Sequence, residues 1–221
     1  MTDPFAAERL LDAALTHVPF DGWSPATLGA AARDAAVDPA LAAALYPRGG
    51  LDLALAYHRR GDAAMREGLA AQDLAALRFR DRVALAVRLR LQAAERESVR
   101  RASALMALPQ NAPEAAKALW STADAIWNAL GDASTDGNWY SKRAILAGVY
   151  GATVLYWLGD TSEGSAETWA FVDRRIEDVM RFEATKAKVR ASPVLNPVLG
   201  LPLRLLERIR APLAGGAMPG R

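Results

Sequence analysis

A group of aromatic and charged residues in the middle of the chain has the composition of a protein-binding surface. Trp139 and Tyr140 stand side by side at the start of an expected helix, acidic residues precede them, and Arg143 follows one turn later. Aromatic and arginine side chains supply much of the binding energy at protein interfaces. Because Trp139 and Tyr140 lie about 100° apart on a helix, we expect at least one ring to be partly exposed. A purely structural interpretation also stands, with Asp136 as a turn or capping residue, Trp139 in the core and Arg143 as its companion at i, i+4.

Residue types suited to catalysis or metal binding are scarce. The chain has no Cys, which excludes disulfides, thiolate metal sites and cysteine nucleophiles. Its two histidines, His17 and His58, lack a Glu at i−3, so the Glu-x-x-His pairs of di-iron bundles cannot be built. The sequence also lacks a nucleophile elbow, a Gly-rich phosphate loop and a Ser/His/Asp set. We therefore expect no metal, no cofactor and no enzymatic activity.

The N-terminal segment 22–47 has the layout of a helix-turn-helix. Ser24 and Asp38, each followed by a proline, predict the starts of two short helices. The second helix, within 37–47, contains no Lys or Arg, although DNA recognition requires cationic side chains on phosphates and polar side chains on base edges. Residues 1–60 carry five Arg against seven acidic residues. We therefore expect no specific DNA binding.

The helical pattern continues through the chain and predicts an all-α protein. Apolar residues recur at spacings of three and four, alanine is abundant, and no alternating β-branched run appears. Helices are expected over residues 4–17, from Ser24, from Asp38 to about 46, over 51–70, twice within 72–107, to about Gly131, over 138–158 and over 162–189, with a loop at 109–113. The expected domains are a headpiece at 1–50, a larger helical domain at 51–190, and a linker with a C-terminal helix at 191–221.

The expected helix 138–158 carries small residues beside an aromatic stripe. Small residues at helical spacing either let a neighbouring helix approach closely or leave volume for an apolar ligand, and dense core packing is a further interpretation. The stripe contains Trp139, Arg143, Leu146, Tyr150, Thr153 and Trp157, with Ala144, Ala147, Gly148 and Gly151 beside it. The residues predicted to contact a lipid are Trp120, Ala147, Gly148, Tyr150, Gly151 and Trp157.

Residues 199–213 predict a short amphipathic helix in a basic C-terminal region. Residues 183–221 hold seven Lys or Arg against two Glu, and a helix of this pattern suits anionic membrane surfaces. The alternative is a terminal helix packed on its own domain or on a second subunit. The residues predicted to contact the membrane are Leu201, Arg204, Leu205, Arg208, Ile209 and Arg210.

Residues 131–145, GDASTDGNWYSKRAI, resemble the coenzyme Q biosynthesis accessory proteins, a lipid-binding family that assists the hydroxylation of demethoxyubiquinone. The residues that carry the resemblance are Asp132, Ser134, Thr135, Asp136, Asn138, Trp139, Tyr140 and Arg143. LLDAALTHVPFDGWS near the N-terminus and ETWAFVDRRIEDV at 167–179 resemble the same family, so the resemblance covers nearly the whole chain.

The resemblance implies a TetR-like all-α fold without operator binding, an apolar pocket for a lipid or quinone intermediate, a homodimer, and a surface that docks the hydroxylase. The docking residues that it implies are Asp136, Trp139, Tyr140 and Arg143, with Trp127 and Leu130 as neighbours. The acidic, helical start MTDPFAAERLLDAAL does not look like a transit peptide. We therefore expect a bacterial protein, peripheral to the cytoplasmic face of the inner membrane.

Two other classes of function stay open. The headpiece layout favours a TetR-family transcriptional regulator that responds to an apolar ligand, whereas the charge of that headpiece opposes it. An enzyme, such as a hydrolase or a quinone-modifying catalyst, lacks a supporting motif.

Overall fold

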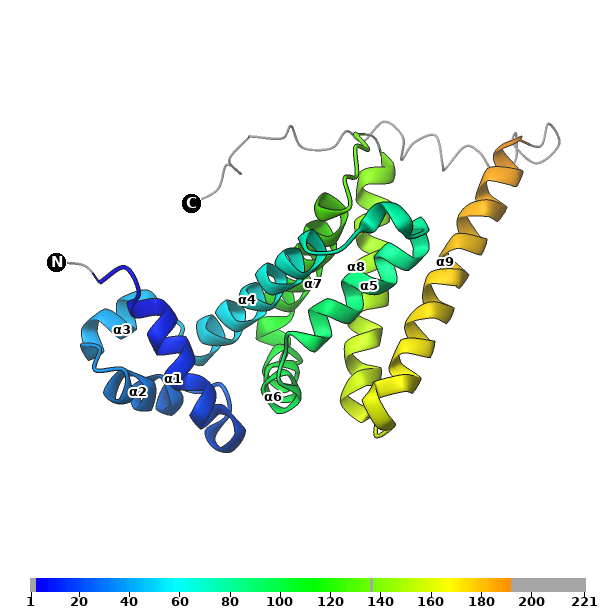
Figure 1. The fold of residues 1–221 in the computed structure, drawn as a ribbon. Helices are drawn as coiled ribbons and strands as arrows, with labels where there is room; N and C mark the ends of the chain where they lie inside the picture. Colours follow the sequence, from blue (N-terminus) through cyan, green and yellow to red (C-terminus); the bar gives the residue numbers. More distant parts are fainter. Residues whose placement is uncertain (1–2, 136, 192–221) are drawn as a thin grey trace. The chain divides into compact units, whose positions relative to one another are not determined.

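The computed structural model describes residues 3–135 and 137–191, which form α-helices and short 3₁₀ turns (Figure 1). The α-helices are α1 Ala6–Asp21, α2 Pro25–Asp34, α3 Pro39–Leu45, α4 Gly50–Ala70, α5 Phe79–Gln92, α6 Arg96–Met106, α7 Ala112–Ala129, α8 Gly137–Gly159 and α9 Ala166–Ala191. The 3₁₀ turns are η1 Leu74–Ala76, η2 Pro109–Asn111 and η3 Glu163–Ser165. No strand occurs in these residues, and the prediction of an all-α protein is confirmed.

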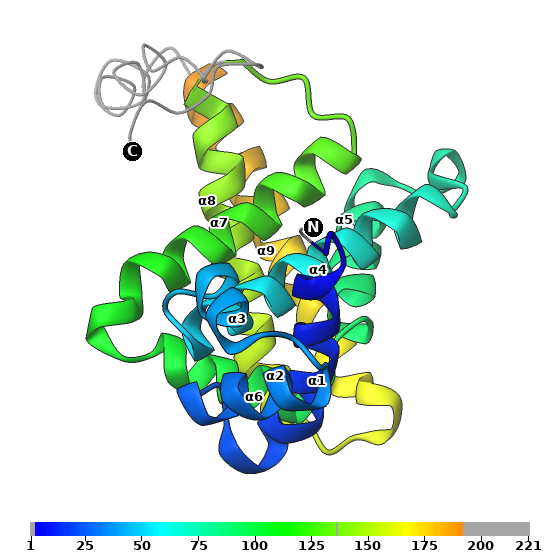
Figure 2. The same ribbon diagram turned by 90° about the vertical axis from the view of Figure 1, so that its left-hand side faces the viewer.

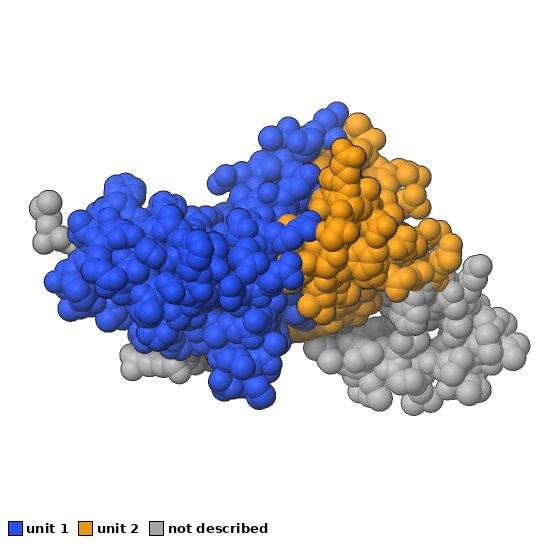
Figure 3. Space-filling model, turned by 90° about the horizontal axis from the view of Figure 1, so that it is seen from below, with its two compact units in different colours: residues 1–73, 86–121 blue, residues 74–85, 122–221 orange. Residues whose placement is uncertain are grey.

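The chain forms two compact units (Figure 3). Unit 1 comprises residues 1–73 and 86–121, and unit 2 comprises residues 74–85 and 122–221. Unit 1 therefore contains the whole of the predicted headpiece together with α4, the second half of α5, α6 and the first half of α7. The predicted C-terminal linker and helix lie outside the described residues, apart from the last residue of α9.

In unit 1, α1, α2 and α3 pack together (Figure 2). The hydroxyl of Ser24 accepts a hydrogen bond from the backbone N–H of Thr27, and the carboxylate of Asp38 accepts one from Ala40. Both helices therefore begin at the predicted capping residues, each with a proline in its first turn. The core of this group consists mainly of small and medium apolar side chains, which are Leu10, Leu11, Ala14, Val18, Ala31, Ala32, Val37 and Ala42.

A buried ion pair joins α4 to α5 within unit 1. Arg90 donates to Asp62 at 2.6 Å and to the carbonyl oxygen of His58 at 2.9 Å. Gly61 lies beneath this arginine, and a Cβ at that position would approach the guanidinium to 2.4 Å. The close approach of the Arg90 side chain to α4 therefore depends on glycine.

In unit 2, α8 and α9 run antiparallel and side by side (Figure 1). Five members of the stripe expected on α8 are buried, namely Arg143, Leu146, Tyr150, Thr153 and Trp157. After α8, Asp160 accepts hydrogen bonds from the backbone N–H groups and the hydroxyls of Ser162 and Thr168. These bonds hold the connection that leads into α9.

The structure corrects three expected boundaries. The first helix continues past Pro19 to Asp21, whereas the sequence predicts an end at about His17. The segment 109–113 is not a loop, because Pro109–Asn111 forms a 3₁₀ turn and α7 begins at Ala112. Pro113 is tolerated there because the first turn of a helix needs no intrahelical N–H donor. The helix expected over 162–189 begins instead at Ala166, after a 3₁₀ turn.

Candidate functional site

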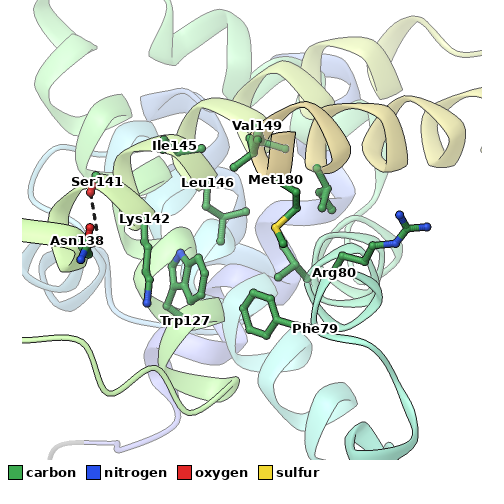
Figure 4. Close-up of a pocket in the computed structure, with 13 residues that line it drawn as sticks. Phe79, Arg80, Trp127, Asn138, Ser141, Lys142, Ile145, Leu146, Val149 and Met180 are labelled. Carbon is green, nitrogen blue, oxygen red and sulfur yellow. Dashed lines mark hydrogen bonds between the residues drawn. The ribbon is translucent and has the colours of Figure 1, made fainter. Parts of the chain in front are cut away.

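An apolar groove of about 370 Å³ is present in unit 2 (Figure 4). Its walls come from α5, α7, α8 and α9, and its volume lies at the lower end of the range typical of small-molecule sites. The apolar lining residues are Phe79, Val83, Trp127, Ile145, Leu146, Val149, Ile176, Val179 and Met180. The polar lining residues are Arg80, Asn138, Ser141 and Lys142.

Helical spacing places the lining residues of α8 and α9 on facing surfaces. Residues 138, 141, 142, 145 and 149 recur at intervals of three and four along α8 and so share one face. On α9 the lining residues also share one face, because Val179 and Met180 follow Ile176 by three and four residues. The first turns of α8 supply polar groups to the groove, whereas its next turns and α9 supply apolar ones.

Trp127 forms one wall of the groove, between Phe79 and Lys142 (Figure 4). Its ring stacks on Phe79 with the centroids 5.5 Å apart and the planes inclined by 26°. The Nζ atom of Lys142 lies 5.1 Å from the centroid of the Trp127 ring. The indole Nε1 of Trp127 is enclosed and has no hydrogen-bond partner among the described residues. An unpaired buried donor is uncommon and costs stability.

A buried arginine connects α7 to the start of α8. Arg143 is 0% exposed and donates to Asp124 at 2.6 Å, to Asn128 at 3.1 Å and to Asp132 at 3.0 Å. It also donates to the carbonyl oxygen of Trp139, and its guanidinium carbon lies 3.9 Å from the centroid of the Trp139 ring. The side chain therefore fixes the position of Trp139 through both a hydrogen bond and a cation–π contact.

Asp132 links this network to the groove. Its carboxylate accepts hydrogen bonds from Lys142 at 2.7 Å, from Ser134 and from Arg143. Burial raises the pKa of the Asp132 carboxyl group, but these hydrogen bonds outweigh that effect and lower the pKa to about 2. The charged carboxylate of Asp132 thus accepts hydrogen bonds from both Lys142, which lines the groove, and the buried Arg143.

The described docking residues do not all lie on one exposed surface. Trp139 and Tyr140 are both partly exposed, which confirms that expectation, and their rings meet edge to face with centroids 4.7 Å apart. Arg143 does not lie on this surface, and it occupies the structural position at i, i+4 beneath Trp139. Trp127 lines the groove, and Leu130 is half-buried just after α7. Asp136 lies outside the described residues.

The six residues predicted to contact lipid do not line this groove. Tyr150 and Trp157 are buried, Trp120, Ala147 and Gly151 are half-buried, and Gly148 is exposed. A Cβ on Gly148 would meet no atom within 4 Å. The periodicity of helix 138–158 could have revealed the face of Ile145 and Val149, but it could not show which face meets α9. The lipid-contact role of the six residues stays a prediction.

The six residues predicted to contact a membrane, from Leu201 to Arg210, lie outside the described residues. Within the described part of the chain, no helix combines the length and the hydropathy needed to span a bilayer.

Comparisons with known proteins identify the family of this chain. The family model described as COQ9 matches residues 112–183, which contain the Arg143 network and most of the groove. The ubiquinone biosynthesis protein COQ9-B of Xenopus laevis is 30% identical over 211 residues, covering 90% of this chain and 71% of that protein. The chain belongs to the COQ9 family.

Mammalian members show the same relationship. The mitochondrial ubiquinone biosynthesis protein COQ9 of Rattus norvegicus is 34% identical over 193 residues, covering 83% of this chain and 62% of the rat protein. The corresponding protein of Homo sapiens is 32% identical over 193 residues, covering 83% of this chain and 60% of its own. The chain thus matches less than two thirds of the length of these two relatives.

The fold resembles that of a transcriptional regulator. The crystal structure of the TetR regulator from Nitrosomonas europaea superimposes with a TM-score of 0.62 at 20% identity, covering 79% of this chain and 97% of that one. The expected TetR-like fold is therefore confirmed. The predicted resemblance to the coenzyme Q accessory proteins is confirmed by the COQ9 relatives.

Proposed function

We propose that this chain is a non-enzymatic accessory protein of ubiquinone biosynthesis that holds a lipid or quinone intermediate and presents it to a ring hydroxylase. The observation that carries this proposal is the apolar groove of about 370 Å³, whose polar end is built from the same turns of α8 that expose Trp139 and Tyr140. The pathway is that of the COQ9 relatives, which are ubiquinone biosynthesis proteins. We also propose, as the sequence predicts, that the protein is bacterial and acts at the cytoplasmic face of the inner membrane.

The lining of the groove suits an isoprenoid or acyl chain. Such a chain has no hydrogen-bonding groups, so burial of its apolar surface provides the binding energy, about 0.8 kcal/mol for each methylene removed from water. Nine of the thirteen lining residues are apolar. Phe79 and Met180 are also substantially exposed at the edge of the groove, which gives a chain a path between solvent and the interior.

The outer face of α8 supports the expected homodimer. Ala144, Gly148, Ala152 and Gly159 are exposed at helical spacing, and Leu155 on the same face is 69% exposed. A Cβ at Gly148 or Gly159 would meet no atom within 4 Å. An exposed apolar face with small residues allows close approach of a helix from a second copy of the chain.

Binding to an anionic membrane through residues 199–213 remains part of the proposal. The support comes from the sequence, in which Arg204, Arg208 and Arg210 stand opposite an apolar face. Removal of the segment after Pro193 is expected to abolish co-sedimentation with anionic liposomes while far-ultraviolet circular dichroism stays unchanged. Loss of the fold or of the dimer in the truncated protein would instead assign the segment a structural role.

Lipid retention tests the function of the groove. Native mass spectrometry of the purified full chain is expected to detect a co-purified lipid or quinone precursor. Val149→Trp should fill the groove and reduce the bound fraction several-fold, because the larger side chain occupies ligand volume. Arg174→Trp is the matched control, since it places the same side chain at an exposed position of α9 that does not line the groove. Equal lipid retention in a folded Val149→Trp protein would show that the groove is not the binding site.

A TetR-family regulator is the second candidate, favoured by the fold of the Nitrosomonas europaea protein. Charge opposes it, because the exposed residues of α3 are Pro39, Ala40, Ala43, Ala44 and Leu45. Arg48, just beyond α3, is held by Asp52 at 2.7 Å and by Glu114 at 3.1 Å. Selection of sites from random duplex DNA is expected to enrich no motif, and recovery of one motif would restore the regulator.

A further inference from the structure

The α8 wall of the groove changes from polar to apolar along the helix. Asn138, Ser141 and Lys142 line the groove near the start of α8, and Ile145 and Val149 line it one and two turns later (Figure 4). A ligand that lies along this wall meets hydrogen-bonding groups at one end and hydrocarbon at the other. Such a surface suits an amphiphile in one orientation.

Lys142 has donor capacity that its contacts within the described residues do not use. An ammonium group carries three N–H donors. Two of them are used by Asp132 at 2.7 Å and by the hydroxyl of Ser134 at 3.1 Å. The side chain is 39% exposed and lines the groove, so its ammonium group is not sealed in the interior.

The other cations near the groove are less suited to this task. Arg143 is fully buried, and its donors are committed to Asp124, Asn128 and Asp132. Arg80 is exposed, and its only ion pair among the described residues is with the half-buried Asp81 at 3.4 Å, so no buried carboxylate fixes its position. Lys142 alone among these three cations is both anchored by a buried carboxylate and accessible.

Two further features favour an oxygen at the polar end of the groove. No Asp or Glu is among its lining residues, and hydrogen bonds from both Lys142 and Arg143 offset the charge of the neighbouring Asp132 carboxylate. The N-terminal end of α8 begins at Gly137, and the dipole of a helix favours negative charge there. Asn138, in the first turn of α8, is the lining residue nearest to this helix end.

We propose that Lys142 is a specificity-determining residue of the groove, which donates a hydrogen bond to an oxygen acceptor at the head of an otherwise apolar ligand. The head lies beside Asn138 and Ser141, and the tail follows Ile145 and Val149 towards α9. The ligand class is therefore an amphiphile with a carbonyl or anionic oxygen at one end. This inference rests on the proposed ligand-binding function and extends it, because it orients the head towards the turn that exposes Trp139 and Tyr140.

Three probes with similar tails and different heads test the assignment. Laurate carries an anionic head, methyl undecyl ketone carries a neutral carbonyl, and dodecane carries no oxygen. The full chain is labelled with fluorotryptophan, and binding is followed by fluorine NMR at the resonance that Trp127→Phe removes. That resonance reports on the groove because Trp127 lines it. We expect all three probes to shift it and the two oxygen-bearing probes to bind more tightly.

Substitution of the lysine separates head recognition from tail binding. Lys142→Met is expected to weaken the binding of laurate and the ketone about tenfold, in line with the loss of a charged hydrogen bond, and to leave dodecane unchanged. Lys142→Arg should retain the preference for oxygen. Lys142→Gln keeps a donor without charge, so it should weaken the binding of laurate more than that of the ketone. Lys117→Met, on the part of α7 in unit 1, is the control and should change none of the affinities.

The outcomes distinguish failure of the Lys142 assignment from failure of the proposed function of the groove. Unchanged affinities for all probes in folded Lys142→Met and Lys142→Gln proteins would overturn the role of Lys142 while the groove keeps its ligand. The same would follow from an equal loss for dodecane. Absence of any shift at the Trp127 resonance with all three probes would overturn the proposed function of the groove itself. Circular dichroism establishes which variants are folded, and Lys142→Gln replaces Lys142→Met if the latter is not.

Discussion

At the scale of single residues, Arg143 fixes the position of Trp139 in the proposed docking surface without being exposed on it. A guanidinium group that leaves water loses several kcal/mol of hydration, so it is stable only where carboxylates and carbonyl oxygens pair its N–H groups. Arg143 has those partners in Asp124, Asp132, Asn128 and the carbonyl oxygen of Trp139. The composition of a binding surface was visible in the sequence, but the burial of the arginine depends on the approach of α7.

Loss of Arg143 should destabilise the protein. Arg143→Met is expected to lower the free energy of unfolding by about 3 kcal/mol, because it leaves the carboxylate of Asp132 buried with fewer partners. Urea unfolding followed by circular dichroism measures the change. The control is Arg181→Met, which removes an exposed pair with Glu177 and should cost less than about 1 kcal/mol. Equal effects of the two substitutions would contradict the structural role of Arg143.

His58 should make the stability depend on pH. Burial, followed by repulsion from Arg90, lowers the pKa of His58 from 6.5 to about 4. The unfolded chain therefore binds more protons than the folded chain between these values. The stabilisation from the neutral ring is complete above pH 6.5 and is lost as the pH falls towards 4, by up to about 3 kcal/mol. Urea unfolding across this range should show a decline that is much smaller in His58→Gln, and an unchanged decline would contradict the assignment.

At the scale of helices, local chemistry predicted where most elements begin. Ser24 and Asp38 cap α2 and α3 as expected, because capping depends on one side chain and the next few N–H groups. The predicted end of the first helix at His17 was wrong, since α1 continues through Pro19 to Asp21. The groove could not be placed in the same way. Several faces of α8 are apolar, and only the packing of α9 shows that Ile145 and Val149 line the groove while Gly148 faces outwards.

Two glycines on different helices should respond with opposite signs to the same substitution. Gly61→Ala in α4 brings a Cβ to 2.4 Å from the Arg90 guanidinium and is expected to cost about 1 to 3 kcal/mol. Gly148→Ala in α8 meets open space and should stabilise the monomer by about 0.5 to 1 kcal/mol, because alanine favours a helix more than glycine does. Thermal and urea unfolding of the two variants provide the comparison. Stabilisation by Gly61→Ala would show that Arg90 can move away from α4 at little cost.

At the scale of the whole molecule, the TetR-like fold combines a headpiece with more acidic than basic residues and a helical domain that contains a groove and a partly exposed aromatic pair. The fold class followed from helical periodicity, and the family followed from residues 131–145. The fold itself does not assign a function, because the same architecture serves a transcriptional regulator. We propose that the groove holds the ligand and that the Trp139–Tyr140 surface binds the partner, which would distinguish a carrier that delivers its ligand from one that only stores it.

Tyr140→Ala tests that distinction most directly. The tyrosine is partly exposed, whereas Trp139 also covers the Arg143 guanidinium, so truncation of Trp139 would disturb the buried network as well. Removal of a central aromatic side chain from an interface costs about 2 kcal/mol or more. We therefore expect Tyr140→Ala to retain its fold and bound lipid, to bind the quinone-ring hydroxylase at least about tenfold more weakly, and to lower ubiquinone in cells that depend on this chain. The matched control is Phe20→Ala, which removes an aromatic ring that is 82% exposed in unit 1 and should leave binding and ubiquinone unchanged. Normal hydroxylase binding and normal ubiquinone in the Tyr140→Ala strain would show that the aromatic pair is not the docking surface, even if the groove binds its ligand as proposed.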